Sequence, residues 1–356
     1  MGRTVVLTGG GTAGHVMPNL AIIPKLKSMG FSVEYIGTAD GMEKEIIGGT
    51  GLPYHVISAG KLRRYLSLKN LTDIGRVLKG CSQAKGLLKD INPVAVFSKG
   101  GFVSVPVVYA ASKLGIPVVL HESDMTPGLA NRLCIPRADK VCVSFEPTLK
   151  HLPKGKGVYT GLPIRTTLLH GDREKGLKLC GFSGKKPVLL IMGGSMGAKA
   201  VNETLDAAMP DITDRFDVAH IRGKSNMLDC CEGKGYAQFG FVDAELPDLY
   251  AAADVMISRA GATAVFEILS LAMPALLVPL TKASSRGDQI LNAEYFEKKG
   301  FSHVIAQEDF APDAILPALE KLYAARTALR DTMKREGVDN AAERVAEIIA
   351  EAAKKA

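Results

Sequence analysis

The sequence lacks the features of a membrane-spanning or exported protein. It contains no run approaching the roughly 20 uninterrupted apolar residues that would cross a bilayer. Its first residues enter a short apolar run and a glycine loop almost at once, without the charged start, long apolar core and cleavage site of a signal peptide. We therefore predict a cytoplasmic protein with no transmembrane segment.

Paired cysteines and clustered metal ligands are also missing. The six cysteines form no C-x-x-C pair, and no cysteine–histidine cluster has the spacing of a zinc site. This pattern favours free thiols in a reducing compartment over a disulfide framework. We predict neither a bound metal nor a cofactor.

What remains is a globular composition. Of the 356 residues, 47% are hydrophobic and 23% are charged, and this length favours two domains. The net charge of +7 indicates anionic partners without separating nucleic acid, phosphorylated metabolites and acidic lipids. Nucleic acid is disfavoured, because the basic residues are not interleaved with aromatics and no recognition module is present.

Short apolar runs that predict buried strands alternate with helix-like segments, as in parallel α/β sheets. The first series comprises residues 4–8, 32–36, 94–97, 118–121 and 141–144. The second comprises residues 188–192, 218–221, 255–258, 275–278 and 303–305. The pattern predicts two Rossmann-like parallel-sheet domains whose ligand loops face a central cleft.

A Gly- and Pro-rich stretch, residues 154–165, separates the two series and predicts a linker. We place the boundary near residues 161–163, which gives domains at 1–161 and 162–339. The final stretch is Ala- and Glu-rich with apolar positions at helical spacing, so we predict an amphipathic helix from residue 340 that packs back on the first domain.

Two glycine loops in the first half each follow a predicted strand and precede a helix. Gly9 to His15 could receive an anion on its backbone N–H groups, or it could be a tight turn. His15 could donate to that anion or accept a proton from a hydroxyl, or it could cap the turn. Gly100 and Gly101 could help to hold the same pyrophosphate, with Lys99 and Phe102 as rim residues in the alternative interpretation.

The second half carries a similar loop and two polar helix starts. Residues 193–198 predict a second anion site, but no acidic residue closes the following strand, so NAD binding is disfavoured. Glu267, one turn inside a helix, could bind both ribose hydroxyls or could face solvent. Asp288 and Gln289 could bind sugar hydroxyls, with Asp288 as a helix cap in the alternative.

A basic and apolar segment follows the second predicted strand. Residues 61–69 (KLRRYLSLK) precede a predicted helix with Leu71, Ile74 and Leu78 near Arg76 and Lys79. This combination suits an anionic membrane surface, and it equally suits an amphipathic helix that covers the sheet.

Together these residues resemble the MurG family of N-acetylglucosaminyltransferases. The resemblance runs essentially end to end and rests on GGGTAGHVMPNL, SKGGFVSVP, HESDMTPGLANRL, TGLPIR, GGSMGAKAVNE, SRAGATAVFE and SRGDQILNAE, in this order. It implies a GT-B fold. It also implies inverting transfer of N-acetylglucosamine from UDP-N-acetylglucosamine to the 4-hydroxyl of undecaprenyl-diphospho-N-acetylmuramoyl-pentapeptide in peptidoglycan synthesis.

The resemblance also implies roles for individual residues. The acceptor diphosphate would lie on Gly10, Gly11, Gly100 and Gly101. Arg165 and Ser195 would bind the donor diphosphate, Phe241 and Val242 uracil, Glu267 ribose, and Asp288 and Gln289 the sugar hydroxyls. The full donor-binding set is Thr12, Gly14, Asp124, Arg165, Ser195, Phe241, Val242, Thr263, Ala264, Glu267, Asp288 and Gln289.

For the chemical step, His15 is the predicted proton acceptor and Glu122 the alternative. Ala13 stands where the family usually has glycine, and Asp124 and Asp288 stand where some members have amides. No D-x-D motif occurs, so we expect helix dipoles and Arg165 to stabilise the departing UDP. A UDP-N-acetylglucosamine epimerase and a non-catalytic, membrane-associated sensor are the competing interpretations.

The resemblance further implies a peripheral location on the cytoplasmic face of the bacterial cell membrane. The expected partners are the donor, the lipid-linked acceptor, the anionic membrane surface and other cell-wall synthesis proteins.

Overall fold

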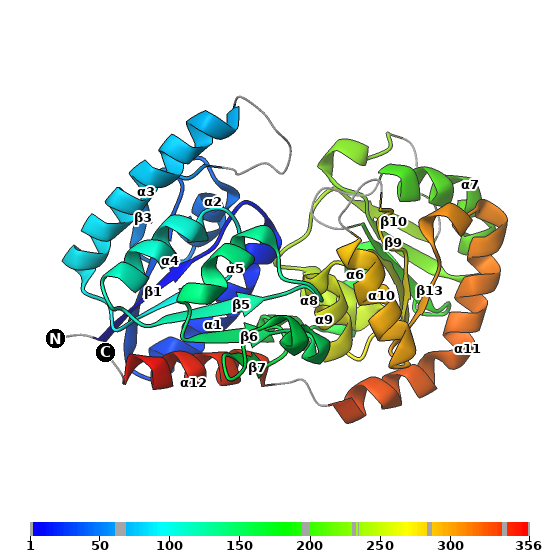
Figure 1. Ribbon diagram of the computed structural model, residues 1–356. Helices are drawn as coiled ribbons and strands as arrows, with labels where there is room; N and C mark the ends of the chain where they lie inside the picture. The colour runs from blue at the N-terminus through cyan, green and yellow to red at the C-terminus, as the bar shows by residue number, and fades with distance from the viewer. Residues whose placement is uncertain are drawn as a thin grey trace. The chain divides into compact units, whose positions relative to one another are not determined.

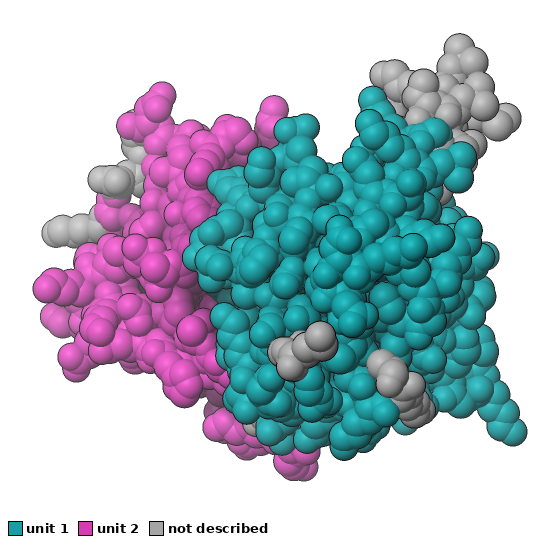
Figure 2. Space-filling model, turned by 90° about the vertical axis from the view of Figure 1, so that its left-hand side faces the viewer, with its two compact units in different colours: residues 1–165, 340–356 teal, residues 166–339 magenta. Residues whose placement is uncertain are grey.

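The computed structural model describes residues 3–60, 69–193, 199–229, 233, 235–282, 287–336 and 340–354, without the side chains of residues 69–74. The chain forms two compact units, which Figure 2 colours separately. Unit 1 contains residues 1–165 and 340–356, and unit 2 contains residues 166–339. The polypeptide thus enters unit 2 once and returns to unit 1 for its last helix.

Unit 1 is built on a seven-stranded sheet in which every pairing is parallel (Figure 1). The order across the sheet is β3-β2-β1-β4-β5-β6-β7. The strands are β1 (Arg3–Thr8), β2 (Phe31–Gly37), β3 (Tyr54–Val56), β4 (Ala95–Ser98), β5 (Val118–Glu122), β6 (Lys140–Val143) and β7 (Gly157–Tyr159). The order reverses between β1 and β4, where loops diverge and ligands of such sheets usually bind.

Helices cover both faces of this sheet, which explains why its central strands are continuous apolar runs. The helices are α1 (Met17–Ser28), α2 (Met42–Gly48), α3 (Lys69–Ile91), α4 (Ser104–Lys113), α5 (Leu129–Cys134) and α12 (Ala341–Ala353). Short 3₁₀ turns are η1 (Ala13–His15), η2 (Ile135–Arg137) and η3 (Glu146–His151). Alternate residues of β1 point to opposite faces, so Leu7 packs in one core cluster and Val6 in the other.

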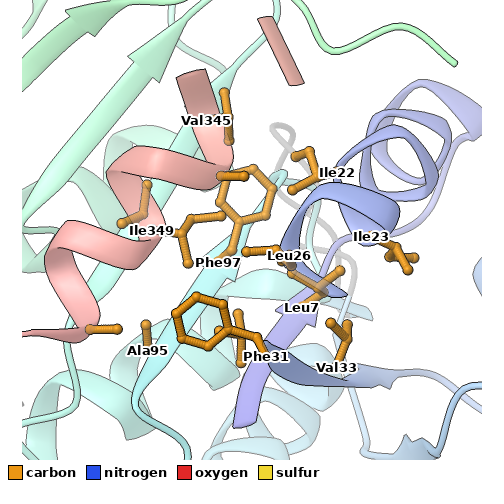
Figure 3. Close-up of a cluster of buried hydrophobic side chains, with 14 of the residues drawn as sticks. Leu7, Ile22, Ile23, Leu26, Phe31, Val33, Ala95, Phe97, Val345 and Ile349 are labelled. Carbon is orange, nitrogen blue, oxygen red and sulfur yellow. The ribbon is translucent and has the colours of Figure 1, made fainter. Parts of the chain in front are cut away.

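The C-terminal helix α12 is part of the core of unit 1 (Figure 3). Val345 and Ile349 are fully buried in one cluster with Ile22 and Leu26 of α1 and Phe97 of β4. Burying an aliphatic side chain of this size contributes about 1.5–3 kcal/mol. The helix therefore helps to hold α1, which follows the first glycine loop, against the sheet.

Unit 2 repeats the architecture with a six-stranded parallel sheet in the order β10-β9-β8-β11-β12-β13. Its strands are β8 (Val188–Met192), β9 (Asp217–Ile221), β10 (Tyr236–Phe239), β11 (Val255–Ser258), β12 (Ala275–Leu277) and β13 (Ser302–Val304). The helices are α6 (Arg173–Cys180), α7 (Lys199–Arg215), α8 (Leu246–Ala252), α9 (Ala262–Ser270), α10 (Asp288–Lys298) and α11 (Pro312–Glu336), with 3₁₀ turns η4 (Thr166–Leu169), η5 (Lys224–Asn226) and η6 (Gln307–Asp309). The order reverses between β8 and β11.

The predicted parallel α/β architecture is confirmed, and each of the ten predicted strands overlaps an observed one. Three short edge strands were not predicted: β3, β7 and β10. The strand β7 lies in the stretch that was predicted to be a linker, because a run of three residues among glycines and prolines is too short to indicate a strand. The units divide after residue 165, slightly beyond the predicted boundary.

Candidate active site

The two glycine loops of unit 1 touch at the point where the strand order reverses. A Cβ atom added at Gly101 would lie 2.1 Å from the carbonyl oxygen of Gly10 and 3.2 Å from Nδ1 of His15. Gly101 has φ +82°, which side chains other than glycine rarely adopt. Gly100 has φ +97°, and a Cβ atom added there would contact the side-chain amide of Asn131. The structure therefore brings together the residues assigned from sequence to the acceptor diphosphate.

Two buried side chains, those of Tyr35 and Asn19, hold the first glycine loop in place. The Tyr35 hydroxyl, on β2, donates to the carbonyl oxygen of Gly9 at 2.7 Å. The side-chain amide of Asn19, on α1, donates to the Tyr35 hydroxyl at 3.1 Å and to the carbonyl oxygen of His15 at 3.5 Å. Asn19 and Tyr35 are fully buried, so the position of this loop is set by the core.

Glu43 contributes a buried carboxylate to the same loop. One oxygen accepts the Gly11 N–H at 3.2 Å, and the other accepts the N–H of Thr38 at 3.2 Å and its hydroxyl at 2.5 Å. The Glu43 side chain is fully buried, and a Cβ atom at Gly10 would lie 2.6 Å from its carboxyl carbon. The carboxylate thus joins the loops that follow β1 and β2.

His15 lies half-buried at the end of η1. Its Nδ1 is 3.0 Å from the Thr12 hydroxyl, and which atom donates depends on the tautomer. When Nδ1–H donates to Thr12, Nε2 is the basic nitrogen of the ring, and when the Thr12 hydroxyl donates instead, Nε2 carries the proton. The contact therefore holds the ring and is compatible with the tautomer in which Nε2 of His15 acts as a base.

Glu122, the alternative proton acceptor, organises the turn that follows β5. Its side chain accepts the N–H groups of Asp124 at 3.0 Å and Gly128 at 2.9 Å, and the side-chain amide of Asn131 at 2.9 Å. Only 4% of Glu122 is exposed. Both oxygens of Glu122 thus accept hydrogen bonds from the turn and from α5.

Lys99 is not a rim residue, contrary to the alternative interpretation from sequence. It follows β4 directly and is only 1% exposed. Its ammonium group donates to the Ser123 hydroxyl in the turn after β5. Burial lowers the pKa of Lys99 to about 8, against the opposing effect of Glu122 and Asp124. The sequence could not show this, because the side chain is enclosed by loops that are distant along the chain.

In unit 2, the start of α9 and the start of α10 lie beside each other. Gln289, in the first turn of α10, accepts the N–H of Leu280 through its side-chain oxygen at 3.0 Å. Its amide nitrogen would lie 3.9 Å from a Cβ atom at Gly261, the N-cap of α9. The buried Asn292 donates to the Ala260 carbonyl oxygen at 3.1 Å and fixes this arrangement.

The predicted ribose ligand is held by a tyrosine. Glu267, on α9, accepts a hydrogen bond from the Tyr250 hydroxyl at 2.9 Å. Thr263 and Ala264 lie in the first turn of the same helix, and Asp288 lies in the first turn of α10 after the N-cap Gly287. The N-cap of α10 is Gly287, so the alternative interpretation of Asp288 as the helix cap is wrong.

The predicted uracil contact is an exposed aromatic surface. Phe241 is 61% exposed, the highest value among the large hydrophobic side chains that the structure describes in unit 2, and Val242 is half-buried. The Lys224 ammonium group lies 5.4 Å from the centre of the Phe241 ring. An exposed aromatic ring beside a cation suits a flat, polar base.

A buried polar network supports this surface. Arg222, at the end of β9, forms two hydrogen bonds to Asp206 at 2.5 and 2.8 Å and one to the Asn226 carbonyl oxygen at 2.7 Å. It also donates to the Tyr236 hydroxyl at 3.2 Å, which in turn lies 3.1 Å from Nδ1 of His220. Arg222 thereby fixes η5, the short turn that carries Lys224.

Some predicted site residues cannot be placed in this geometry. Ser195 and its loop, residues 194–198, lie outside the described residues, as does the basic segment 61–68. Arg165 is the last residue of unit 1, and Gly14 lies within η1 in that unit.

The described part of the chain has neither a cluster of metal ligands nor a membrane-spanning helix. Across those residues, no group of three or more histidine, cysteine or acidic side chains could hold a metal ion. No helix among them is long and apolar enough to cross a membrane.

Sequence reasoning missed four residues of this site: Asn19, Tyr35, Glu43 and Arg222. The sequence held a signal for one of them, since Glu43 lies in the first turn of α2, which follows β2 at the same sheet edge as the glycine loops. The others act through contacts between separate elements, which spacing does not reveal.

Comparison with known proteins covers nearly the whole chain. Residues 5–143 match the family model for the glycosyltransferase family 28 N-terminal domain, and residues 188–351 match that for its C-terminal domain. The sequence is 51% identical over 350 residues to the UDP-N-acetylglucosamine--N-acetylmuramyl-(pentapeptide) pyrophosphoryl-undecaprenol N-acetylglucosamine transferase of Lachnoclostridium phytofermentans, covering 98% of this chain and 99% of that protein.

A second relative and a solved structure agree with this match. The Clostridium botulinum (strain Hall) protein of the same name is 50% identical over 348 residues, which is 98% of each chain. The crystal structure of Acinetobacter baumannii MurG is similar with a TM-score of 0.76 and 26% identity, covering 98% of this chain and 99% of that one. The predicted GT-B fold is confirmed by this structural similarity.

Proposed function

Because the chain belongs to glycosyltransferase family 28, we propose that it transfers N-acetylglucosamine from UDP-N-acetylglucosamine to undecaprenyl-diphospho-N-acetylmuramoyl-pentapeptide. The new bond forms at the muramoyl 4-hydroxyl with inversion at the anomeric carbon. The observation that carries this proposal is 50–51% identity, over 98% of the chain, to relatives named for this transfer.

The glycine loops of unit 1 are suited to the acceptor diphosphate. Gly10, Gly11, Gly100 and Gly101 present backbone without side chains at the edge of the sheet, so phosphate oxygens can approach the main chain closely. The Gly11 N–H already donates to Glu43. We therefore assign the diphosphate to the neighbouring N–H groups of the two loops.

His15 is the proton acceptor that this geometry favours. The acceptor hydroxyl oxygen forms a bond to the anomeric carbon while the bond from that carbon to UDP breaks, and UDP leaves with the electron pair. The hydroxyl proton passes to Nε2 of His15, and Thr12 holds Nδ1–H. Glu122 is assigned to the architecture of its turn, because both of its oxygens accept hydrogen bonds.

Unit 2 supplies the donor contacts. We assign ribose to Glu267, which Tyr250 orients, and uracil to Phe241 and Val242. The sugar hydroxyls are assigned to Asp288 and Gln289, beside the start of α9.

The departing diphosphate is assigned to Arg165 and Ser195, with the first turn of α9 at Thr263 and Ala264. Helix N–H groups and a guanidinium stabilise the negative charge that develops on UDP.

We further propose that the protein acts at the cytoplasmic face of the membrane without crossing it. The acceptor is lipid-linked, and Arg76, Leu78 and Lys79 of α3 are exposed, with Leu78 at 66%. Co-sedimentation with phosphatidylglycerol vesicles tests this. Replacing Arg76 and Lys79 with glutamate should weaken binding by a factor that shrinks as salt rises. Equal binding by both proteins would remove α3 from the membrane contact.

The transfer reaction is tested by UDP release from UDP-N-acetylglucosamine with and without the lipid-linked acceptor, in detergent that contains EDTA. We expect release that depends on the acceptor and survives EDTA. Release without acceptor would indicate hydrolysis or epimerisation. Saturable donor binding with no release would indicate a non-catalytic sensor.

A further inference from the structure

Lys99 is a buried cation at the junction of three strand ends. Its backbone N–H donates to the Thr8 carbonyl oxygen at 2.9 Å, which places it beside the first glycine loop. Its Cβ would lie 3.1 Å from a Cβ atom on Gly9. Lysine is almost never fully buried unless its charge is balanced, because leaving water costs an ammonium group several kcal/mol.

The groups that face Lys99 come from β5, from the turn after it and from β6. They are His121 and Glu122, then Asp124, and finally Cys142. Burial and the nearby Lys99 charge hold the pKa of His121 well below its usual value, and burial raises the pKa of Cys142 to about 12. Both groups are therefore neutral near pH 7, so the carboxylates of Glu122 and Asp124 balance the ammonium charge.

We propose that Lys99 is a positioning residue for the transfer reaction, whose buried ammonium group balances Glu122 and Asp124 and holds the turn between them against the glycine loops. The contact is direct, since Lys99 donates to the hydroxyl of Ser123 between the two acidic residues. The same turn is joined to the second glycine loop through Asn131, which donates to Glu122 and faces Gly100.

This inference rests on the proposed function, because the turn matters for catalysis only if the glycine loops bind the acceptor. Two acidic residues in a three-residue turn repel each other unless a cation lies between them. Without the ammonium group the turn should open and move Asn131 away from Gly100. The donor contacts of unit 2 involve none of these residues.

The charge on Lys99 should also give the reaction an alkaline limit. The pKa of Lys99 is about 8 in the folded protein, so the ammonium group loses its proton as the pH rises through this value. The kcat/KM for the acceptor should then fall toward a tenfold loss per pH unit. A histidine base would instead produce an acidic limb below about pH 6.5, well separated from this one.

The experiment compares Lys99→Met, which keeps the length and removes the charge, with the double variant Lys99→Met/Asp124→Asn. We expect Lys99→Met to lower kcat/KM for the acceptor on the order of 10- to 100-fold and to remove the alkaline limb. The KM for the donor is measured in every variant as well, because the resemblance places Asp124 in the donor-binding set. The added Asp124→Asn change should restore activity several-fold, because an amide needs no balancing cation. Lys99→Arg, which stays charged, should move the limb above pH 10.

Two results would overturn the inference: a Lys99→Met variant with the kcat/KM and alkaline limb of the parent, or a double variant no better than Lys99→Met. Absence of acceptor-dependent UDP release from the parent chain would refute the proposed function instead. In that case thermal unfolding of the parent, the Lys99→Met, Asp124→Asn and double variants still tests the charge pairing. Additive changes in Tm would then refute it.

Discussion

Replacing Glu43 with alanine should loosen the first glycine loop and destabilise unit 1. The change removes the acceptor for three donors: the N–H of Gly11, the N–H of Thr38 and the Thr38 hydroxyl. It also leaves a cavity beneath Gly10, since the Glu43 side chain is fully buried. The loop should then sample positions that do not bind the acceptor.

The size of the effect follows from these bonds. Leaving a buried donor unsatisfied costs about 1–3 kcal/mol. Gly11 is exposed and Thr38 half-buried, so water can replace part of what Glu43 accepts. We therefore expect the free energy of unfolding to fall by roughly 2–4 kcal/mol, near the lower end of the range for three unsatisfied donors. For a unit of this size, each kcal/mol lowers the Tm by about 2–4 °C.

The assay combines thermal unfolding with steady-state kinetics. Glu43→Ala should raise the KM for the lipid acceptor, leave the KM for UDP-N-acetylglucosamine unchanged and lower the Tm by roughly 5–15 °C. Glu43→Gln is the matched control. It keeps one acceptor oxygen, so its Tm and its KM for the acceptor should lie between those of Glu43→Ala and the parent. A Glu43→Ala variant with the Tm and acceptor KM of the parent would show that Glu43 does not hold the loop.

Three further predictions concern other parts of the chain. Gly101→Ala should abolish transfer, because its Cβ would lie 2.1 Å from a carbonyl oxygen. The control, Gly115→Ala, has a similar φ of +73° but lies in open space, so it should lose only about 1–2 kcal/mol of stability and no activity. Burial lowers the pKa of His220 to about 3, so the unfolded chain binds a proton that the folded unit does not. Stability should therefore fall by up to about 1.4 kcal/mol per pH unit between pH 6.5 and 3, as denaturant midpoints would show, and His220→Gln should flatten this slope. Tyr250→Phe removes the 2.9 Å hydrogen bond to Glu267 and should raise the donor KM several-fold, measured by UDP release, without changing the acceptor KM.

Each of these predictions has a contrary outcome. If the Gly101→Ala and Gly115→Ala variants transferred equally well, close contact between the two glycine loops would not be needed for catalysis. If the stability of the His220→Gln variant fell with pH as steeply as that of the parent, groups other than His220 would cause the loss of stability in acid. A Tyr250→Phe variant with an unchanged donor KM would show that Glu267 needs no orienting partner.

Several features of this protein are determined by local sequence. The largely apolar runs at residues 188–192 and 255–258 correspond to β8 and β11 residue for residue, because strands buried on both faces are predominantly apolar. The requirement for glycine at Gly100 and Gly101 is also determined locally, since their positive φ values exclude most other residues. Motif order also indicates the family.

The tertiary structure alone decided which side chains support the site. Lys99 and Glu43 are ordinary charged residues in the sequence, and both are buried because loops far away in the chain close over them. The edge strand β7 has only three residues, too few to indicate a strand along the chain, and it is recognised by its pairing with β6. Burial and charge pairing depend on what surrounds a residue in space, and a single sequence records only what precedes and follows it.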